Sequence, residues 1–126
     1  MKILIQCAAV GVGGFVGAIA RFLVALVCGR FFGTGFPIGT LIINLTGSFF
    51  LGWFLTAIGG RTIVSDHVRL AIAVGFVGAY TTFSTYMYES TALMDDGAWF
   101  KAMFNLIGSL ILGLIAVRLG IWVAAR

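Results

Sequence analysis

The sequence predicts an all-α membrane protein with four transmembrane helices in one domain, residues 1–126. Hydrophobic residues make up 61% of the 126 residues and charged residues 10%, and the mean hydropathy is +1.13. A soluble domain carries about 25% charged residues, so this chain could not cover its own surface in water. Glycine is also abundant, at 18 residues, which suits helices that approach one another closely in lipid.

Four apolar runs, separated by polar or glycine-rich connections, each contain about the 20 residues that a bilayer crossing requires. The single proline, Pro37, suits the start of the second helix. The sequence Asp95-Asp96-Gly97 predicts a polar turn before the fourth helix. The expected spans are residues 3–28, 38–58, 70–94 and 98–125.

The charged residues exclude several functions. The eight lysines and arginines are scattered, so no basic cluster suits nucleic acid. One histidine and two cysteines leave no usual zinc site or catalytic triad, so we do not expect an enzyme. Lysine and arginine divide five to three between the two sides of the membrane, a weak bias that fixes orientation poorly. A chain that inserts both ways could form an antiparallel homodimer, and a single orientation is equally compatible with the charges.

Polar residues recur every four positions in two spans. Thr40, Asn44 and Ser48 form one stripe of the second helix, and Asn105 and Ser109 form one of the fourth. Such stripes are either packing seams or the wall of a solute path. For the two asparagines both interpretations are open, because large amides are costly in mid-span. Packing is favoured for the small members of the stripes, Ser48, Gly52 and Gly113, and for Gly13 and Gly17 of the first span.

The third span contains a predicted break. Gly75 and Gly78 precede Thr81-Thr82, and this combination favours unwinding within residues 79–82. Unwound backbone inside a membrane is tolerated where it lines a cavity or where its carbonyls find a partner such as a cation. The alternative is a kinked helix in which serine and threonine bond back to their own carbonyls. The broken helix is the favoured interpretation.

The third span also resembles a known family. Gly75, Phe76 and Gly78, followed by Thr81-Thr82-Phe83-Ser84-Thr85, are similar to the signature of the Fluc (CrcB) fluoride channels. The resemblance covers the whole chain, including its length and its four spans. Matching residues elsewhere are Arg21, Gly39, Thr40, Asn44, Leu45 and Ser109.

The resemblance implies a passive fluoride channel, built as an antiparallel, dual-topology homodimer with two pores. It implies a structural sodium ion at the dimer centre, held by the backbone carbonyls of Gly78 and Thr81. The two pore phenylalanines of the family map to Phe83 and Tyr86, and its fourth-span pore position, often tyrosine, maps to Asn105. Tyr86 and Asn105 thus depart from the family pattern. The implied setting is the lipid of a bacterial plasma membrane, where the channel would export cytoplasmic fluoride and give fluoride resistance.

The chemistry of the residues suits this function. Fluoride is small and strongly hydrated, so a pore must replace its water with donors that hold it weakly enough to let it leave. Aromatic ring edges carry partial positive charge, and amides and hydroxyls donate hydrogen bonds. No group needs to ionise, which favours passive conduction. The candidate pore residues are Asn44, Phe83, Tyr86, Ser84, Asn105, Ser109, Thr40 and Arg21.

Two other functions stay open at this level. A small dual-topology, proton-coupled drug or cation exporter would need a carboxylate near the centre of the first span. That span has only Gln6 and Arg21, and Glu89 is the sole acid inside an apolar run. A purely structural subunit with packing seams and no pore is the other alternative. Dependence of transport on a proton gradient would distinguish an exporter from a channel.

Overall fold

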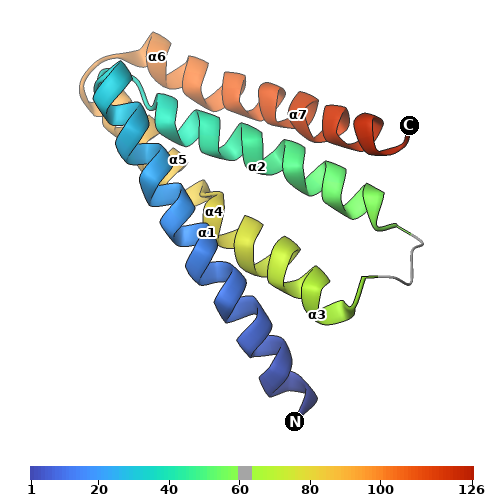
Figure 1. Cartoon of the computed structure of the whole chain (residues 1–126). Helices are drawn as coiled ribbons and strands as arrows, with labels where there is room; N and C mark the ends of the chain where they lie inside the picture. Colours follow the sequence, from blue (N-terminus) through green and yellow to red (C-terminus); the bar gives the residue numbers. More distant parts are fainter. Residues whose placement is uncertain (60–63) are drawn as a thin grey trace.

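Four long helices form the whole described chain (Figure 1). The computed structural model describes residues 1–59 and 64–126, and within them only helices, turns and short connections occur. Arg61, one of the basic residues counted for the orientation in the membrane, lies outside the described residues. The all-helical, multi-pass class predicted from the sequence is confirmed. The four spans are Lys2–Phe32, Ile38–Ala57, Asp66–Asp95 and Trp99–Ala124.

The first span, α1 (Lys2–Phe32), is longer than the sequence predicted. It includes Arg30, which the sequence pattern had placed after its end. The helix stops at Gly33, whose φ of 70° is accessible to glycine without steric cost. Its 31 residues span about 46 Å at ~1.5 Å per residue, against a hydrocarbon core of about 30 Å. Accordingly, its N-terminal end extends beyond α3 (Asp66–Arg69), the start of the third span (Figure 1).

The second and fourth spans pack side by side and run in the same direction (Figure 1). Gly52 lies against the backbone of Val117, and Gly120 lies against Phe49 and Trp53. A β-carbon at either glycine would collide with the facing backbone, so these small residues set the distance between the helices. The packing role predicted for Gly52 is confirmed. The elements are α2 (Ile38–Ala57) in the second span, and α6 (Trp99–Met103), the π-helix η2 (Phe104–Gly108) and α7 (Ser109–Ala124) in the fourth.

The third span consists of several segments. It begins earlier than predicted, because the side chain of Ser65 accepts the backbone N–H of Val68 at 3.4 Å and caps the first turn. Residues predicted to lie in the polar connection, including Asp66 and Arg69, are therefore helical. The segments are α3 (Asp66–Arg69), the π-helix η1 (Leu70–Val77), α4 (Gly78–Tyr80) and α5 (Phe83–Asp95).

The first half of the third span packs on α1 through small residues. Gly13 faces the backbone of Ala71, Gly17 faces that of Phe76, and Gly75 faces that of Val10. This confirms that Gly13 and Gly17 form a packing face. The close contact fixes η1 and α4 against α1 and leaves α5 to contact α2, α6 and η2.

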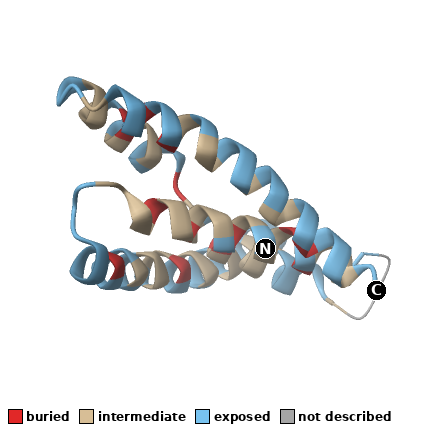
Figure 2. Cartoon of the chain, turned by 90° about the horizontal axis from the view of Figure 1, so that it is seen from above, coloured by how far each residue is buried: buried red, intermediate tan, exposed pale blue. Residues whose placement is uncertain are grey.

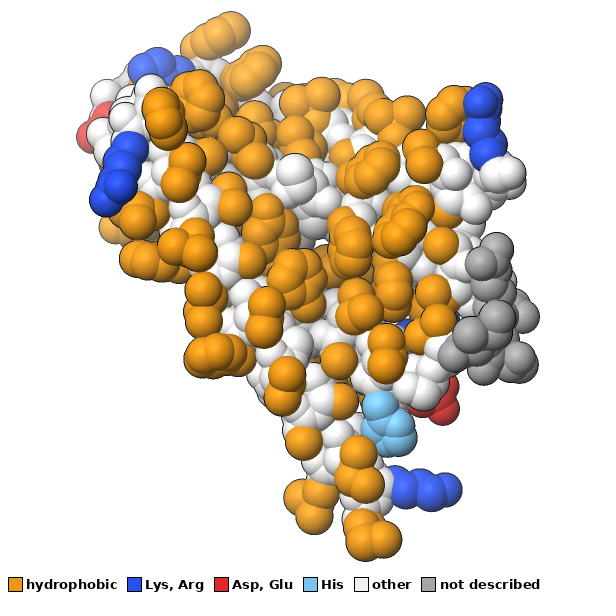
Figure 3. All heavy atoms as spheres, viewed as in Figure 1, with side chains coloured by type: hydrophobic (Ala, Val, Ile, Leu, Met, Phe, Trp, Pro, Cys, Tyr) orange, Lys and Arg blue, Asp and Glu red, His pale blue; other side chains and the backbone are white. Residues whose placement is uncertain are grey.

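The surface is apolar around the middle of the molecule and charged near its ends. In Figure 3, hydrophobic side chains cover most of the visible face, and the charged side chains lie near the ends of the helices. Buried residues are few and lie between facing helices (Figure 2). Leucine, isoleucine and phenylalanine are instead exposed along α1 and α7. In a soluble protein such large apolar side chains are mostly buried, so their exposure here fits a lipid environment.

Candidate functional site

The third span unwinds at Thr81 and Thr82. Both residues have extended backbone, with φ and ψ of −77° and 158° at Thr81 and of −148° and 121° at Thr82. The Thr82 hydroxyl oxygen accepts the N–H of Thr85 at 3.3 Å and so caps the new helix α5. The break predicted within residues 79–82 is confirmed. α4 is the short helical piece between η1 and this break.

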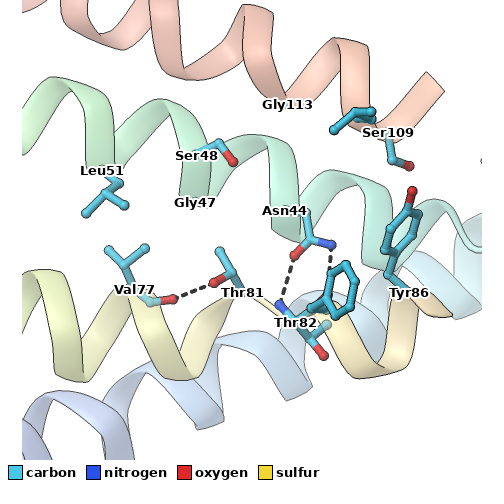
Figure 4. Close-up of a pocket in the computed structure, with 12 residues that line it drawn as sticks. Asn44, Gly47, Ser48, Leu51, Val77, Thr81, Thr82, Tyr86, Ser109 and Gly113 are labelled. Atoms are coloured by element: carbon cyan, nitrogen blue, oxygen red, sulfur yellow. Dashed lines mark hydrogen bonds between the residues drawn. The ribbon is translucent and has the colours of Figure 1, made fainter. Parts of the chain in front are cut away.

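Asn44 of α2 holds the unwound backbone in place. Its Oδ1 accepts the Thr82 N–H at 2.8 Å, and its Nδ2 donates to the Thr82 carbonyl oxygen at 3.0 Å (Figure 4). The side-chain amide thus pairs with both backbone polar groups of one residue, as a neighbouring strand would. This satisfies two groups whose exposure to lipid would cost several kcal/mol each. The second hydrogen of Nδ2 is still available to a ligand.

The break also releases two backbone carbonyls from helical pairing. In a continuous helix, the N–H of Thr82 would donate to Gly78 O and the N–H of Thr85 to Thr81 O. Here the first N–H donates to Asn44 and the second to the Thr82 hydroxyl. The carbonyl oxygens of Gly78 and Thr81 therefore have their usual donors engaged elsewhere. Gly78 is exposed, and a β-carbon there would meet open space.

A groove of about 320 Å³ opens beside the break (Figure 4). Residues of the second, third and fourth spans line it. The packing of α2 on α7 brings the second and fourth spans together on this side of the break. Among these described lining residues there is no Asp, Glu, Lys, Arg or His. The lining residues are Asn44, Gly47, Ser48, Leu51, Val77, Thr81, Thr82, Phe83, Tyr86, Ser109, Leu110 and Gly113.

Phe83 and Tyr86 form the aromatic part of the groove. Their ring centroids are 5.9 Å apart with an interplanar angle of 61°, so one ring presents its edge to the other. The Tyr86 hydroxyl donates to the carbonyl oxygen of Leu106 at 2.6 Å. Phe83 is 73% exposed on the protomer surface. The Tyr86 ring is therefore held to the fourth span by a hydrogen bond, whereas one side of the Phe83 ring is exposed.

A buried hydrogen-bond chain lies behind Ser109. The Ser109 hydroxyl donates to Asn105 Oδ1 at 3.3 Å, and Asn105 Nδ2 donates to Ser90 Oγ at 2.9 Å. The Ser90 hydroxyl in turn donates to the Tyr86 carbonyl oxygen at 2.7 Å. Asn105 and Ser90 are 1% and 2% exposed. The chain joins the fourth span to α5 and directs the hydroxyl proton of Ser109 into the protein.

The predicted pore residues do not all meet at this groove. Asn44, Phe83, Tyr86 and Ser109 line it, as does Thr81 of the predicted ion site. Asn105 lies behind the wall, bonded to Ser109. Gly78, Ser84, Arg21 and Thr40 are not among the lining residues: Gly78 and Ser84 are exposed, Arg21 on α1 is half-buried, and Thr40 is buried beside another groove.

That other groove, of about 280 Å³, lies near the end of α5. Thr40 and Glu89 line it together with residues of the first connection, including Pro37. Glu89 Oε2 is buried and has no hydrogen-bond partner in residues 1–59 and 64–126. The only acid inside an apolar run therefore lies in the helix that follows the break, seven residues after Thr82, but it belongs to a different cavity.

Some residues of the groove were not recognised from the sequence. Ser48 and Gly113, interpreted as packing positions, line the groove instead. Ser90 and the carbonyl of Leu106 were not singled out, although both hold Tyr86 or its neighbours. Ser90 lies four residues after Tyr86 and one helical turn from it, which is the only sequence signal that could have indicated it.

The groove offers a small number of uncharged donors on an apolar wall. The hydroxyl protons of Tyr86 and Ser109 are directed to oxygen acceptors. The second N–H of Asn44, the Ser48 hydroxyl and the aromatic rings are then the groups of this wall that can contact an anion. Such a surface suits a small anion held weakly. A chain with four apolar spans and this groove at a broken helix is a multi-pass integral membrane protein of the solute-conducting class.

Comparison with known proteins identifies the family. Residues 8–121 match the family described as CrcB-like protein, Camphor Resistance (CrcB). The chain is 49% identical over 115 residues to the fluoride-specific ion channel FluC of Chlorobium phaeobacteroides, covering 91% of this chain and 89% of that protein. It is 44% identical over 115 residues to the fluoride-specific ion channel FluC of Prosthecochloris aestuarii, covering 91% of this chain and 89% of that protein. It is 48% identical over 108 residues to the FluC of Koribacter versatilis, covering 86% of each chain. The chain belongs to the CrcB family.

Proposed function

We propose that the protein is a passive fluoride channel and that the groove at the break forms part of its conduction path. The observation that carries this proposal is the groove itself: amide, hydroxyl and aromatic groups without a charged side chain, in a chain of the CrcB family. Relatives named as fluoride-specific ion channels, at up to 49% identity over most of the chain, support fluoride as the ion.

Passive conduction follows from the chemistry of the groove. A pore must bind its ion well enough to admit it and weakly enough to release it. One amide hydrogen, one serine hydroxyl and two aromatic rings provide such weak contacts, whereas an arginine or lysine would trap fluoride. Cells need such a path because hydrogen fluoride enters uncharged, dissociates in a more neutral cytosol and accumulates as the anion. An inside-negative potential would then drive fluoride out through the channel.

The proposed assembly is an antiparallel homodimer. The groove is open on one side of the protomer, and Phe83 beside it is 73% exposed. An anion path through lipid must be enclosed, because the free-energy cost of placing an ion in hydrocarbon is prohibitive. A second copy of the chain would close it, and the weak bias in the distribution of lysine and arginine permits either orientation.

The proposed dimer would hold a structural sodium ion at its centre. The carbonyl oxygens of Gly78 and Thr81 fit this role, since the donors of a regular helix are engaged elsewhere. Two copies would supply four neutral oxygens, a set that suits a hard monovalent cation. When bound, the ion would satisfy these carbonyls at a depth where water is scarce.

The proton-coupled exporter is the less supported alternative. Its central carboxylate is missing from the first span, and Glu89 lines a different groove from that at the break. The similarity to fluoride-specific channels also argues against it.

Fluoride efflux from liposomes that contain only this protein tests the proposal. We expect efflux with no proton or sodium gradient, provided that a potassium ionophore balances the charge, and much slower chloride efflux under the same conditions. A fluoride-selective and a chloride-selective electrode measure the two rates. Strict dependence on an imposed proton gradient would favour the exporter, and the absence of any efflux would favour a structural subunit.

Tyr86→Phe is expected to keep most of the fluoride flux. The substitution retains the ring edge, and the hydroxyl that it removes already donates to Leu106 O rather than to the groove. Its cost is one hydrogen bond, about 1 kcal/mol of stability. Efflux and thermal unfolding of the same preparation distinguish the two effects. A loss of flux in a variant that stays folded would mean that the hydroxyl itself contacts the ion.

Sodium depletion is expected to impair fluoride flux without any coupled sodium transport. Thr81→Ser should conduct normally, because the proposed ligand is a backbone carbonyl and serine keeps the hydroxyl that donates to Val77 O at 2.9 Å. Efflux is measured after prolonged dialysis against a sodium-free buffer and again after sodium is restored. Flux that is indifferent to this treatment would leave the ion without support.

A further inference from the structure

The C-terminal part of the fourth span carries a groove of its own, separate from the one at the break. Its volume is about 750 Å³, and the side chains around it are aliphatic except for one arginine and one tryptophan. We propose that this groove binds an anionic phospholipid, with Arg118 and Arg126 holding the phosphate headgroup above an acyl chain. The residues around it are Leu114, Ile115, Arg118, Leu119, Ile121, Trp122 and Ala125.

Arg118 requires an anionic partner. It lies inside the hydrophobic span and is exposed on the outside of the protomer. It forms no ion pair with any residue in 1–59 or 64–126. A charged side chain in a span normally faces the bundle interior or a water-filled cavity, because lipid tails cannot solvate it. Six residues, or about 9 Å of helix, separate it from the end of α7 at Ala124, so its guanidinium can extend along the helix toward the headgroup region.

Arg126 and Trp122 supply the rest of the site. The Arg126 guanidinium carbon lies 3.6 Å from the centroid of the Trp122 ring, a cation–π contact that directs the second positive charge back over the helix. Arg118 and Trp122 are four positions apart and are therefore rotated by only about 40° around α7, so they share one face. Arg126 follows the end of α7, and its contact with Trp122 places its guanidinium beside that face. Tryptophan is itself enriched at the level of lipid headgroups. Two cations and an interfacial ring thus border one apolar groove.

A lipid suits this face better than a second copy of the chain. Residues 98–126 contain three cations, Lys101, Arg118 and Arg126, and no aspartate or glutamate. A symmetric contact of this face with itself would therefore bring arginines into an apolar interface with no acid from the same span to pair them. Such burial of unpaired charge is strongly unfavourable. A phosphodiester provides the missing charge, and its acyl chain matches the aliphatic side chains.

Quenching of tryptophan fluorescence by brominated lipids tests the proposal. The protein is reconstituted in phosphatidylcholine vesicles with a minor fraction of phosphatidylglycerol, and either lipid carries the bromine. The difference between the wild type and Trp122→Phe isolates the signal of Trp122 from those of Trp53 and Trp99. We expect phosphatidylglycerol to be enriched around Trp122 by about fivefold per arginine, from the attraction of a basic side chain to an anionic headgroup.

Charge variants assign that enrichment to the site. Arg118→Gln and Arg126→Gln should each lower the enrichment of phosphatidylglycerol around Trp122 by about fivefold. Arg118→Lys should retain most of this enrichment, and it also tests whether position 118 tolerates a replacement. Arg30→Gln, which removes the same charge at the end of α1, is the matched control and should leave it unchanged. Equal quenching by both lipids, or enrichment that survives both glutamine variants, would overturn the proposal. Absence of quenching by either lipid would overturn it too, in favour of a protein contact at this face.

Discussion

Asn44→Leu is expected to abolish most fluoride flux. Leucine has the same number and branching of side-chain heavy atoms but removes both hydrogen bonds to Thr82, which leaves the N–H and the carbonyl of Thr82 without their partner. Each buried backbone group left unsatisfied costs about 1–3 kcal/mol. The break would then rearrange or the variant would unfold, and flux should fall by more than about tenfold, the factor that 1.4 kcal/mol represents. Liposome efflux combined with size-exclusion chromatography of the variant measures both effects.

Two further variants show whether the hydrogen bonds of Asn44 cause the loss. Ser48→Ala changes the next position of the same stripe and the same groove wall but keeps both hydrogen bonds of Asn44 to Thr82, so it should reduce flux far less than Asn44→Leu does. Asn44→Asp keeps the acceptor for the Thr82 N–H but loses the donor to the Thr82 carbonyl and adds negative charge on the proposed anion path. It should fold better than Asn44→Leu and still conduct poorly. Normal flux in Asn44→Leu would show that the amide is dispensable.

Phe83→Ile is expected to reduce fluoride flux strongly while leaving the protein folded. The ring is 73% exposed on the protomer, so isoleucine leaves no core cavity, but it removes the partly positive ring edge from the groove. The edge-on contact with Tyr86 is lost as well. Aromatic contacts of this kind contribute about 0.5–1.5 kcal/mol, so we expect a loss approaching tenfold.

Phe15→Ile is the matched control for that experiment. Phe15 is 70% exposed on α1 and does not line the groove at the break, so its replacement removes the same atoms from a lipid-facing surface. Its flux should equal that of the wild type. If Phe83→Ile also conducts normally, the aromatic ring has no part in conduction. If both variants lose flux, the effect is general destabilisation.

The sequence itself determined the number of spans, the apolar surface and the break in the third span. These features follow from local properties: hydropathy over about 20 residues, and glycines followed by Thr81-Thr82. The family signature is equally local, because it lies mostly in one continuous segment. Helix ends were less predictable. Arg30 stays helical because Gly33 is the residue that can reverse the backbone, and Ser65 starts α3 early by capping it.

Only the tertiary structure decided which polar residues meet. Asn44 and Asn105 are the same residue type and have similar positions in their stripes. Asn44 nevertheless pairs with the unwound backbone, whereas Asn105 is buried in a chain of hydrogen-bonded side chains. Their partners, Thr82 and Ser90, are 38 and 15 residues away in sequence, and the packing of the helices brings them into contact. A sequence specifies that a polar group in lipid needs a partner. The position of the helices determines which partner it finds, because hydrogen bonds form only within about 3 Å.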